Sequence, residues 1–275
     1  MKIKLWGTRG SIPSPGKETV KYGGNTTCVQ VSLESGTEII IDAGTGIRKL
    51  GKVLLQNGVN EIHLFITHSH WDHIQGFPFF VPVYIKGFKI HIYGASPTFD
   101  RLVRILSGQM KFLYFPVEYH TLNSEIDYRK IKKRGIEIGG VKITAIRTNH
   151  PLETHAFKFE EDGKTFVFMT DNELDDREKA VVPYEEHLKF IEGADLLIHD
   201  AQYSRAEYEN FIGWGHSTWE SVVEMADEGD VKRVLLTHHD PERSDEALDK
   251  IIKDAKEHAK NTEVDGAMEG MELQL

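Results

Sequence analysis

The stretch EIHLFITHSHWDH, residues 61–73, decides how the rest of the chain is interpreted. It begins with an apolar run typical of a buried strand, which we expect to end at Thr67. The ligand-type side chains that follow within the next six residues are His68, His70, Asp72 and His73. Neutral imidazoles and carboxylates suit zinc or a related ion, and a turn after a strand lets such side chains converge. The pattern therefore predicts a metal site at a strand end, the alternative being a histidine-rich surface turn.

Four more apolar runs lead into histidine or aspartate in the same way. Residues 141–147 lead to His150, residues 165–169 to Asp171, residues 196–198 to His199 and Asp200, and residues 234–236 to His238 and His239. Because α/β proteins assemble their sites from loops at strand ends, we expect these side chains to meet in one site. The other histidines are interpreted as structural inside strands, at His63 and His91, or as ordinary surface residues, at His120, His187 and His258.

Turn signals between short apolar runs predict many strands and fewer helices. Strands are expected at Ile3–Trp6, Cys28–Leu33, Glu38–Ile41, Ile62–Thr67, Lys89–Tyr93, Val141–Arg147, Ala156–Glu160, Thr165–Met169, Leu196–His199, Arg233–Thr237 and Met271–Leu275. Helices are expected at Gly46–Gln56, Pro97–Leu106 after a Ser-Pro start, Tyr184–Ile191, Ser217–Glu228 and Ser244–Lys260. Residues 108–135 look irregular and rich in aromatic side chains, and they could form a flap or an interface. A homodimer is an additional expectation, with no segment assigned to its interface.

Composition sets the limits of these interpretations. The 275 residues are 40% hydrophobic and 28% charged, which is typical of a folded globular protein, and no linker or repeat divides them, so one domain over residues 1–275 is expected. The single cysteine, Cys28, excludes disulfides within the chain and cysteine-rich zinc modules. The net charge of −10 argues against a broad nucleic-acid footprint. With no signal peptide and no membrane-spanning run, a cytoplasmic location is expected.

The ordered motifs of the chain resemble those of the metallo-β-lactamase superfamily, over almost its whole length. The motifs are HSHWDH at 68–73, His150, the Thr170-Asp171 step and Leu236-Thr-His238. Three further stretches are similar to the ribonuclease Z and phosphoribosyl cyclic phosphodiesterase branch: LIHDAQY around Asp200, GHSTW at 215–219, and the opening GTRGSIP with Gly23-Gly-Asn-Thr. The resemblance implies an α/β fold, a four-layer αββα sandwich of two mixed β-sheets flanked by helices.

The same resemblance implies two divalent metal ions per chain. It assigns His68, His70 and His150 to one ion, Asp72, His73 and His238 to the other, and Asp171 as the bridge between them. His239 is the alternative to His238, which is preferred because it follows Leu-Leu-Thr as the ligand of the family does. Zinc is expected, with manganese or iron as alternatives, because geometry and supply decide which metal is bound.

The implied mechanism follows from the charges of this centre. Two divalent ions and two carboxylates leave a net positive charge, which selects anions such as phosphodiesters. The ions would lower the pKa of a shared water to about 7 and so supply a bridging hydroxide, which Asp72 could orient or deprotonate. His216, held by Asp200, is the implied general acid for the leaving oxygen, the alternative being that His216 and Asp200 only begin and cap a helix.

The sequence gives the least indication of which residues bind the substrate. Arg9, Ser11 and Asn25, with the neighbouring Thr26, could contact phosphate oxygens, although a glycine-rich turn explains Gly23-Gly-Asn equally well.

The substrate class is inferred from one difference between this sequence and ribonuclease Z. Ribonuclease Z carries a tRNA-clamping arm between the residues that correspond to His150 and Asp171, which here are 21 positions apart, enough only for a hairpin. We therefore expect a phosphodiesterase for small, including cyclic, phosphodiesters and not for tRNA. The alternatives are a thioester or lactone hydrolase, which needs no Asp200–His216 pair, and a non-catalytic metal-binding module, which needs neither seven ligands nor an open position.

Overall fold

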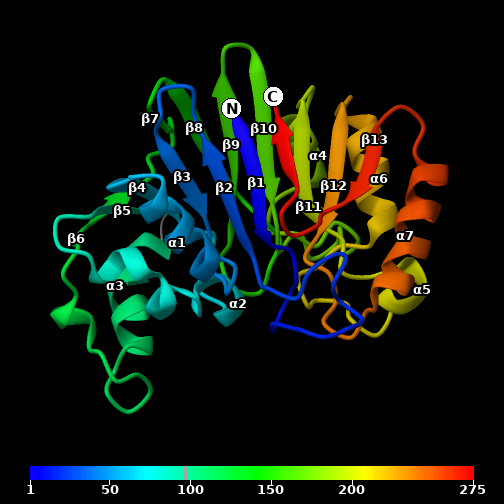
Figure 1. Cartoon of the computed structure of the whole chain (residues 1–275). Coiled ribbons are helices and arrows are strands. Elements are labelled where there is room, and N and C mark those ends of the chain that lie inside the picture. Colours follow the sequence, from blue (N-terminus) through cyan, green and yellow to red (C-terminus); the bar gives the residue numbers. More distant parts are fainter. Residues whose placement is uncertain (96–97) are drawn as a thin grey trace.

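Two mixed β-sheets form the centre of the computed structural model, which describes residues 1–95 and 98–275 (Figure 1). The first sheet has the order β14 (Glu272–Gln274), β1 (Lys2–Gly7), β2 (Cys28–Ser32), β3 (Glu38–Ile41), β4 (Glu61–Phe65), β5 (Lys89–Gly94) and β6 (Glu125–Lys130). The second has the order β13 (Glu263–Gly266), β12 (Arg233–Thr237), β11 (Leu196–Asp200), β10 (Lys164–Met169), β9 (His155–Glu161), β8 (Val141–Arg147) and β7 (Ile136–Ile138).

Helices cover the outer face of each sheet (Figure 1). The first sheet is covered by α1 (Ile47–Gln56), α3 (Thr98–Gln109) and the 3₁₀ turns Phe77–Phe79 and Val81–Tyr84, and the second by α4 (Tyr184–Ile191), α6 (Trp219–Glu228) and α7 (Asp245–His258). The short helices α2 (Trp71–Ile74) and α5 (Arg205–Tyr208) and the 3₁₀ turn Tyr119–Thr121 complete the elements named here. In the described part of the chain, no helix has the length and apolar character that crossing a bilayer requires.

Alternation along the strands explains why both faces of each sheet are buried. On β4, Ile62 and Leu64 pack under the helices of the first sheet, while Phe65 points between the sheets and meets Phe157 and Phe159 of β9 edge-on. The core between the sheets and the two cores under the helices give four layers, which confirms the predicted αββα sandwich.

Strand direction gathers the predicted ligands His150, Asp171 and His238 at one edge of the second sheet. β10, β11, β12 and β13 are parallel, and β8 runs the same way because β8 and β10 both pair antiparallel with β9. The segments after β8, β10, β11 and β12 therefore leave the sheet at the same edge, as parallel strands do in α/β proteins.

The structure differs from the sequence expectations mainly at short or polar elements. β6 lies inside residues 108–135, which were expected to be irregular, and it alternates between exposed and half-buried residues rather than forming an apolar run. β7 and β13 have three and four residues and were not predicted. The expected Ser96-Pro97 helix start lies outside the described residues. His187 was expected at the surface but is buried on α4, with Nε2 2.9 Å from the carbonyl oxygen of Arg147.

Candidate metal centre

The turn after β4 places the HSHWDH side chains in one small volume. His70, in extended conformation, is the N-cap of α2, whose first turn carries Asp72 and His73. Asp171 and His238 stand just after β10 and β12 and adopt left-handed backbone conformations, with φ of 55° and 57°. Such backbone is uncommon for residues other than glycine and is found where a site fixes the direction of a side chain.

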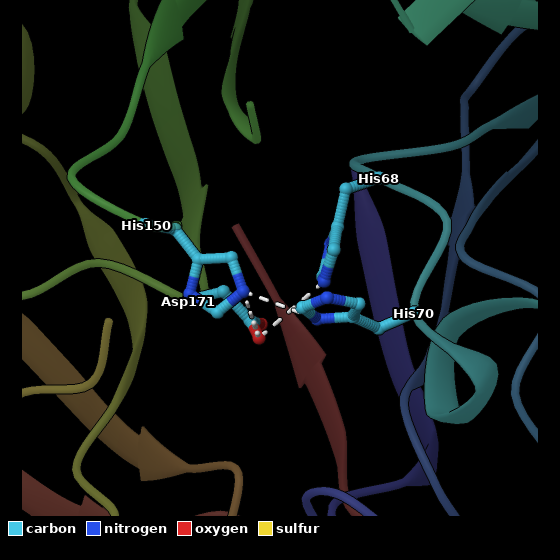
Figure 2. Close-up of side chains that lie close together, drawn as sticks. All are labelled: His68, His70, His150 and Asp171. Atoms are coloured by element: carbon cyan, nitrogen blue, oxygen red, sulfur yellow. Dashed lines mark hydrogen bonds and ion pairs between the residues drawn. The ribbon is translucent and has the colours of Figure 1, made fainter. Parts of the chain in front are cut away.

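One group of side chains combines both sheets. His68 and His70 approach from the turn after β4, and His150 and Asp171 from the loops after β8 and β10 (Figure 2). Nε2 of His150 lies 3.1 Å from Nδ1 of His70, and Oδ1 of Asp171 lies 3.6 Å from Nε2 of His68 and 3.9 Å from Nε2 of His150. Four donor atoms from three strand ends thus surround one point.

The second group uses the other oxygen of Asp171. Nε2 of His73 lies 3.2 Å from Oδ2 of Asp72 and 3.2 Å from Oδ2 of Asp171. Nε2 of His238 lies 3.1 Å from Oδ2 of Asp72 and 3.6 Å from Oδ2 of Asp171. The structure therefore brings together all seven residues predicted as metal ligands, in two groups that Asp171 joins through its two oxygens.

An oxygen atom behind each of four imidazoles turns its Nε2 toward this centre. The partners are Asp42 Oδ2 at 2.7 Å from His73 Nδ1, Gln202 Oε1 at 3.0 Å from His238 Nδ1, the Gly215 carbonyl oxygen at 3.0 Å from His150 Nδ1, and Thr67 Oγ1 at 3.1 Å from His68 Nδ1. Histidines that bind metals are held in this way, since the bond at one ring nitrogen fixes the direction of the other.

The donor atoms fit a divalent cation. Nε2 of His68 and Nε2 of His73 are buried, and neither has a hydrogen-bond partner among the described residues. Ligand atoms about 2.0–2.2 Å from a tetrahedral ion lie roughly 3.3 Å apart, which is close to the separations in both groups. Two buried ring nitrogens without hydrogen-bond partners, beside two carboxylates, are the arrangement that an ion would complete.

Burial and neighbouring charges set the protonation states of the side chains in the centre. Burial lowers the pKa of His68 and brings that of His150 to about 4, so both are neutral at physiological pH, the form that binds metals. Burial alone would raise the pKa of Asp171, but the neighbouring His238 and His73 outweigh it and hold that pKa below its ordinary value. The pKa of His238 is in turn raised, because Asp171 and Asp72 outweigh the opposite effect of burial.

His216 and Asp200 lie beside the centre. Nδ1 of His216 is 3.4 Å from Oδ2 of Asp200, an ion-pair distance, although its geometry is not that of a hydrogen bond. The Asp200 carboxylate is fully buried and accepts the backbone N–H groups of Asn172 and Ser217, both at 3.1 Å. His216 stacks on His238 with ring centroids 4.9 Å apart, and it also lies within ligand reach of Asp171 and His238.

An open cavity of about 410 Å³ leads to these side chains. Its lining consists of Ser11, Ser69, His70, Trp71, Asp72, Asp171, His216 and His238. Ser11, one of the expected substrate-binding residues, donates its backbone N–H to Oδ2 of Asp72 at 2.9 Å.

The other expected substrate contacts do not line this cavity. The guanidinium of Arg9 is buried and donates to the carbonyl oxygens of Gly23, Asp240 and Arg243. Asn25 binds the carboxylate of Glu269 through its backbone N–H and its side chain. These two side chains hold loops together, and a sequence does not show which carbonyl oxygens a guanidinium will meet.

The contacts of His238 and His239 show which of these two candidate metal ligands faces the centre. His238 faces the centre, whereas Nε2 of His239 lies 2.8 Å from the carbonyl oxygen of Ala267. Three further residues that support the centre were not predicted from the sequence: Asp42, Gln202 and Glu173. Asp42 follows the run Ile39–Ile41, a strand-end signal like those used for the ligands. Glu173, which accepts the N–H groups of Gly213 and Gly215 beside His216, gives no such signal.

Comparisons with known proteins identify the family and agree with the fold. The sequence profile of the beta-lactamase superfamily domain matches residues 37–239. The chain is 25% identical to the ribonuclease Z of Picrophilus torridus over 300 aligned residues, covering 93% of this chain and 90% of that protein. The metallo-beta-lactamase fold protein YhfI from Bacillus subtilis superposes with a TM-score of 0.75 at 19% identity, covering 99% of this chain and 98% of that one. A diphosphatase from the PhnP family superposes with a TM-score of 0.69 at 17% identity, covering 100% and 97%.

Proposed function

Because the chain belongs to the beta-lactamase superfamily and is a metal-dependent hydrolase of its ribonuclease Z-like branch, we propose that it hydrolyses small phosphodiesters, cyclic ones included. The observation that carries the proposal is the position of His216. Its imidazole lines the same cavity as four of the ligand residues and is backed by the buried carboxylate of Asp200. A proton donor at this place serves a poor leaving group such as an alkoxide.

The metal ions in this proposal are two per chain, with zinc first and manganese or iron as alternatives. His68, His70 and His150 would hold one, Asp72, His73 and His238 the other, and Asp171 both, since its two oxygens face different groups. When bound, such ions polarise phosphoryl oxygens and lower the pKa of a water molecule to about 7.

The side chains of the protein supply the remaining steps. Nδ1 of His216 faces Asp200, so Nε2 is the nitrogen left to give a proton to the leaving oxygen. Asp200 stabilises the positive charge of the imidazolium, and its bonds to two backbone N–H groups keep it in place. Asp72 is held by the Ser11 N–H and presents its carboxylate at the cavity wall, where it can orient an attacking water molecule.

Two observations favour a small substrate over tRNA. The hairpin of β9 and β10 takes up most of the interval between His150 and Asp171, where a clamping arm would be inserted. The net charge of −10 does not favour a long polyanion, whose binding depends on many phosphate contacts. Separately, the indole of Trp71 is 78% exposed at the cavity wall and offers a flat apolar face to a base or another planar group of the substrate.

A turnover screen on the metal-loaded full chain tests the proposal. The substrates are bis-p-nitrophenyl phosphate, 2′,3′- and 3′,5′-cyclic nucleotides, a thioester, a lactone and a precursor tRNA. We expect turnover of the small diesters and little cleavage of the tRNA. Asp171→Asn should abolish that turnover and reduce the metal content, while His120→Gln, a change at an exposed histidine, should alter neither.

Other outcomes of the screen would overturn the proposal. Efficient removal of a tRNA 3′ trailer, weakening steeply as salt rises, would assign the chain to RNA processing. Faster turnover of the thioester or the lactone than of any diester would assign it to acyl hydrolysis. Retained metal without turnover of any of these substrates would favour a metal-binding module.

A further inference from the structure

A second cluster of ligand-type side chains lies on β4 and β5, outside the centre described above. Glu61 and His63 are two residues apart on β4 and therefore share a face of the strand. His91 of β5 is the direct register partner of His63, and the two rings are 4.9 Å apart. One donor atom from each of these three residues lies within 4.8 Å of the other two.

An oxygen atom holds one ring nitrogen of each histidine. Nδ1 of His91 lies 2.5 Å from Oδ1 of Asp127 on β6, and Nε2 of His91 lies 3.1 Å from Oε1 of Glu61. Nδ1 of His63 lies 3.0 Å from the hydroxyl of Tyr93. This repeats the pattern of the main centre, where the bond at one ring nitrogen directs the other toward a shared point.

The charged neighbours of the cluster either bind other groups or lie at a distance from its ligand atoms, which chiefly contact one another. Burial, with His91 as the next cause, lowers the pKa of His63 to about 4, so its ring is neutral. Arg129 is engaged by Oδ2 of Asp127 and by the Tyr93 hydroxyl. Lys89 approaches Oε2 of Glu61 only to 3.9 Å, while the other oxygen of Glu61 faces His91.

We propose that Glu61, His63 and His91 form a separate binding site for a divalent transition-metal ion, with zinc as the best match. Two imidazoles and one carboxylate are a known ligand set for zinc, with water in the fourth position. Asp127 and Tyr93 hold the two rings in place from β6 and β5. The bound ion ties β4, which leads into the HSHWDH turn, to β5.

The test is the zinc stoichiometry of the full chain. The metal-free protein is dialysed to equilibrium against buffered free zinc up to about 100 μM, and zinc per chain is measured by elemental analysis. Wild type should bind one more ion than Glu61→Gln or His91→Gln, or bind that ion at least tenfold more tightly. His120→Gln is the matched control at a histidine outside the cluster and should bind as wild type does.

The variants distinguish loss of this site from loss of the main centre and from misfolding. Glu61 is exposed, so Glu61→Gln removes a ligand without disturbing the core, and it should leave diester turnover and circular dichroism unchanged. Because the readout is the difference between variants, it holds whatever number of ions the main centre takes. Equal zinc binding by wild type, Glu61→Gln and His91→Gln would overturn the proposal. The cluster would then serve only as a set of hydrogen bonds between neighbouring strands.

Discussion

Nδ1 of His73 lies 2.7 Å from Oδ2 of Asp42, and both side chains are fully buried. Asp42 follows β3 with a left-handed φ of 61° and also accepts the hydroxyl and the backbone N–H of Thr67, both at 2.8 Å. Oδ2 therefore serves His73 and Thr67, and Oδ1 serves the backbone just before His68. The carboxylate of Asp42, which follows β3, therefore fixes the start of the HSHWDH turn, which follows β4.

Asp42→Asn should weaken metal binding about 10- to 100-fold, as changes behind metal-binding histidines commonly do. Asparagine tolerates a left-handed backbone but carries no charge to hold the His73 ring. Zinc affinity measured with a competing chelator checks this. The matched control is Asp162→Asn, at an exposed turn aspartate that is also left-handed, with φ 47°, and it should leave the affinity unchanged. Equal affinities in Asp42→Asn and wild type would show that Thr67 alone suffices to hold the turn.

The candidate ligands could be proposed from the sequence because each lies in the segment after a strand, a signal that Asp42 shares, and the family resemblance then divided them into two groups. The fold was implied by the family resemblance, and the apolar runs agree with it because strands buried on both faces are apolar throughout. What could not be predicted depends on distant contacts. Arginine is a residue type that commonly binds phosphate, but the guanidinium of Arg9 donates its hydrogen bonds to three backbone carbonyl oxygens. The register partners Lys89 and Glu125 show why β6 was missed, since it is a polar edge strand recognised only beside β5.

Acid should destabilise the protein through His155. Burial lowers the pKa of His155 to about 4, from an ordinary value near 6.5, so the unfolded state binds more protons between these two values. The stability that this histidine contributes is complete above about pH 6.5 and falls as the pH drops toward 4. The loss is on the order of 2 kcal/mol between pH 7 and pH 5.

Urea unfolding of the metal-free chain at pH 7 and pH 5 measures this effect. His155→Gln and His155→Phe should both have a smaller difference between the two pH values than wild type, whatever their absolute stability. The same pH dependence in all three proteins would show that other groups cause the acid effect.

Trp71→Ala should raise KM for diesters that carry a base or another planar group about tenfold, with little change in kcat. Stacking on an aromatic side chain contributes about 1–3 kcal/mol, and Trp71 is the exposed aromatic residue among those that line the cavity. Trp71→Phe should recover most of the loss. Trp214→Ala, at another exposed tryptophan that is absent from the lining, is the control. An equal rise in KM for a dialkyl diester would mean that Trp71 shapes the cavity and does not stack.

His216→Ala and Asp200→Ala should separate proton donation from metal binding. Neither residue is assigned to an ion, so both variants should keep the metal content of wild type, even though His216 lies within ligand reach of Asp171 and His238. Loss of general acid catalysis should lower kcat about 10²-fold or more for a diester with an alkoxide leaving group. The loss should shrink for bis-p-nitrophenyl phosphate, because p-nitrophenolate leaves without protonation.

The dependence on the leaving group, measured with metal content in the same samples, decides among the roles of His216. A loss of rate that is equal for good and poor leaving groups would mean that His216 positions the substrate. A lower metal content in His216→Ala would make it a ligand, as its distance to Asp171 and His238 also allows. Full activity of Asp200→Ala toward poor leaving groups would leave Asp200 the structural role that its two backbone bonds already describe, and thioester or lactone hydrolysis would then be the better proposal.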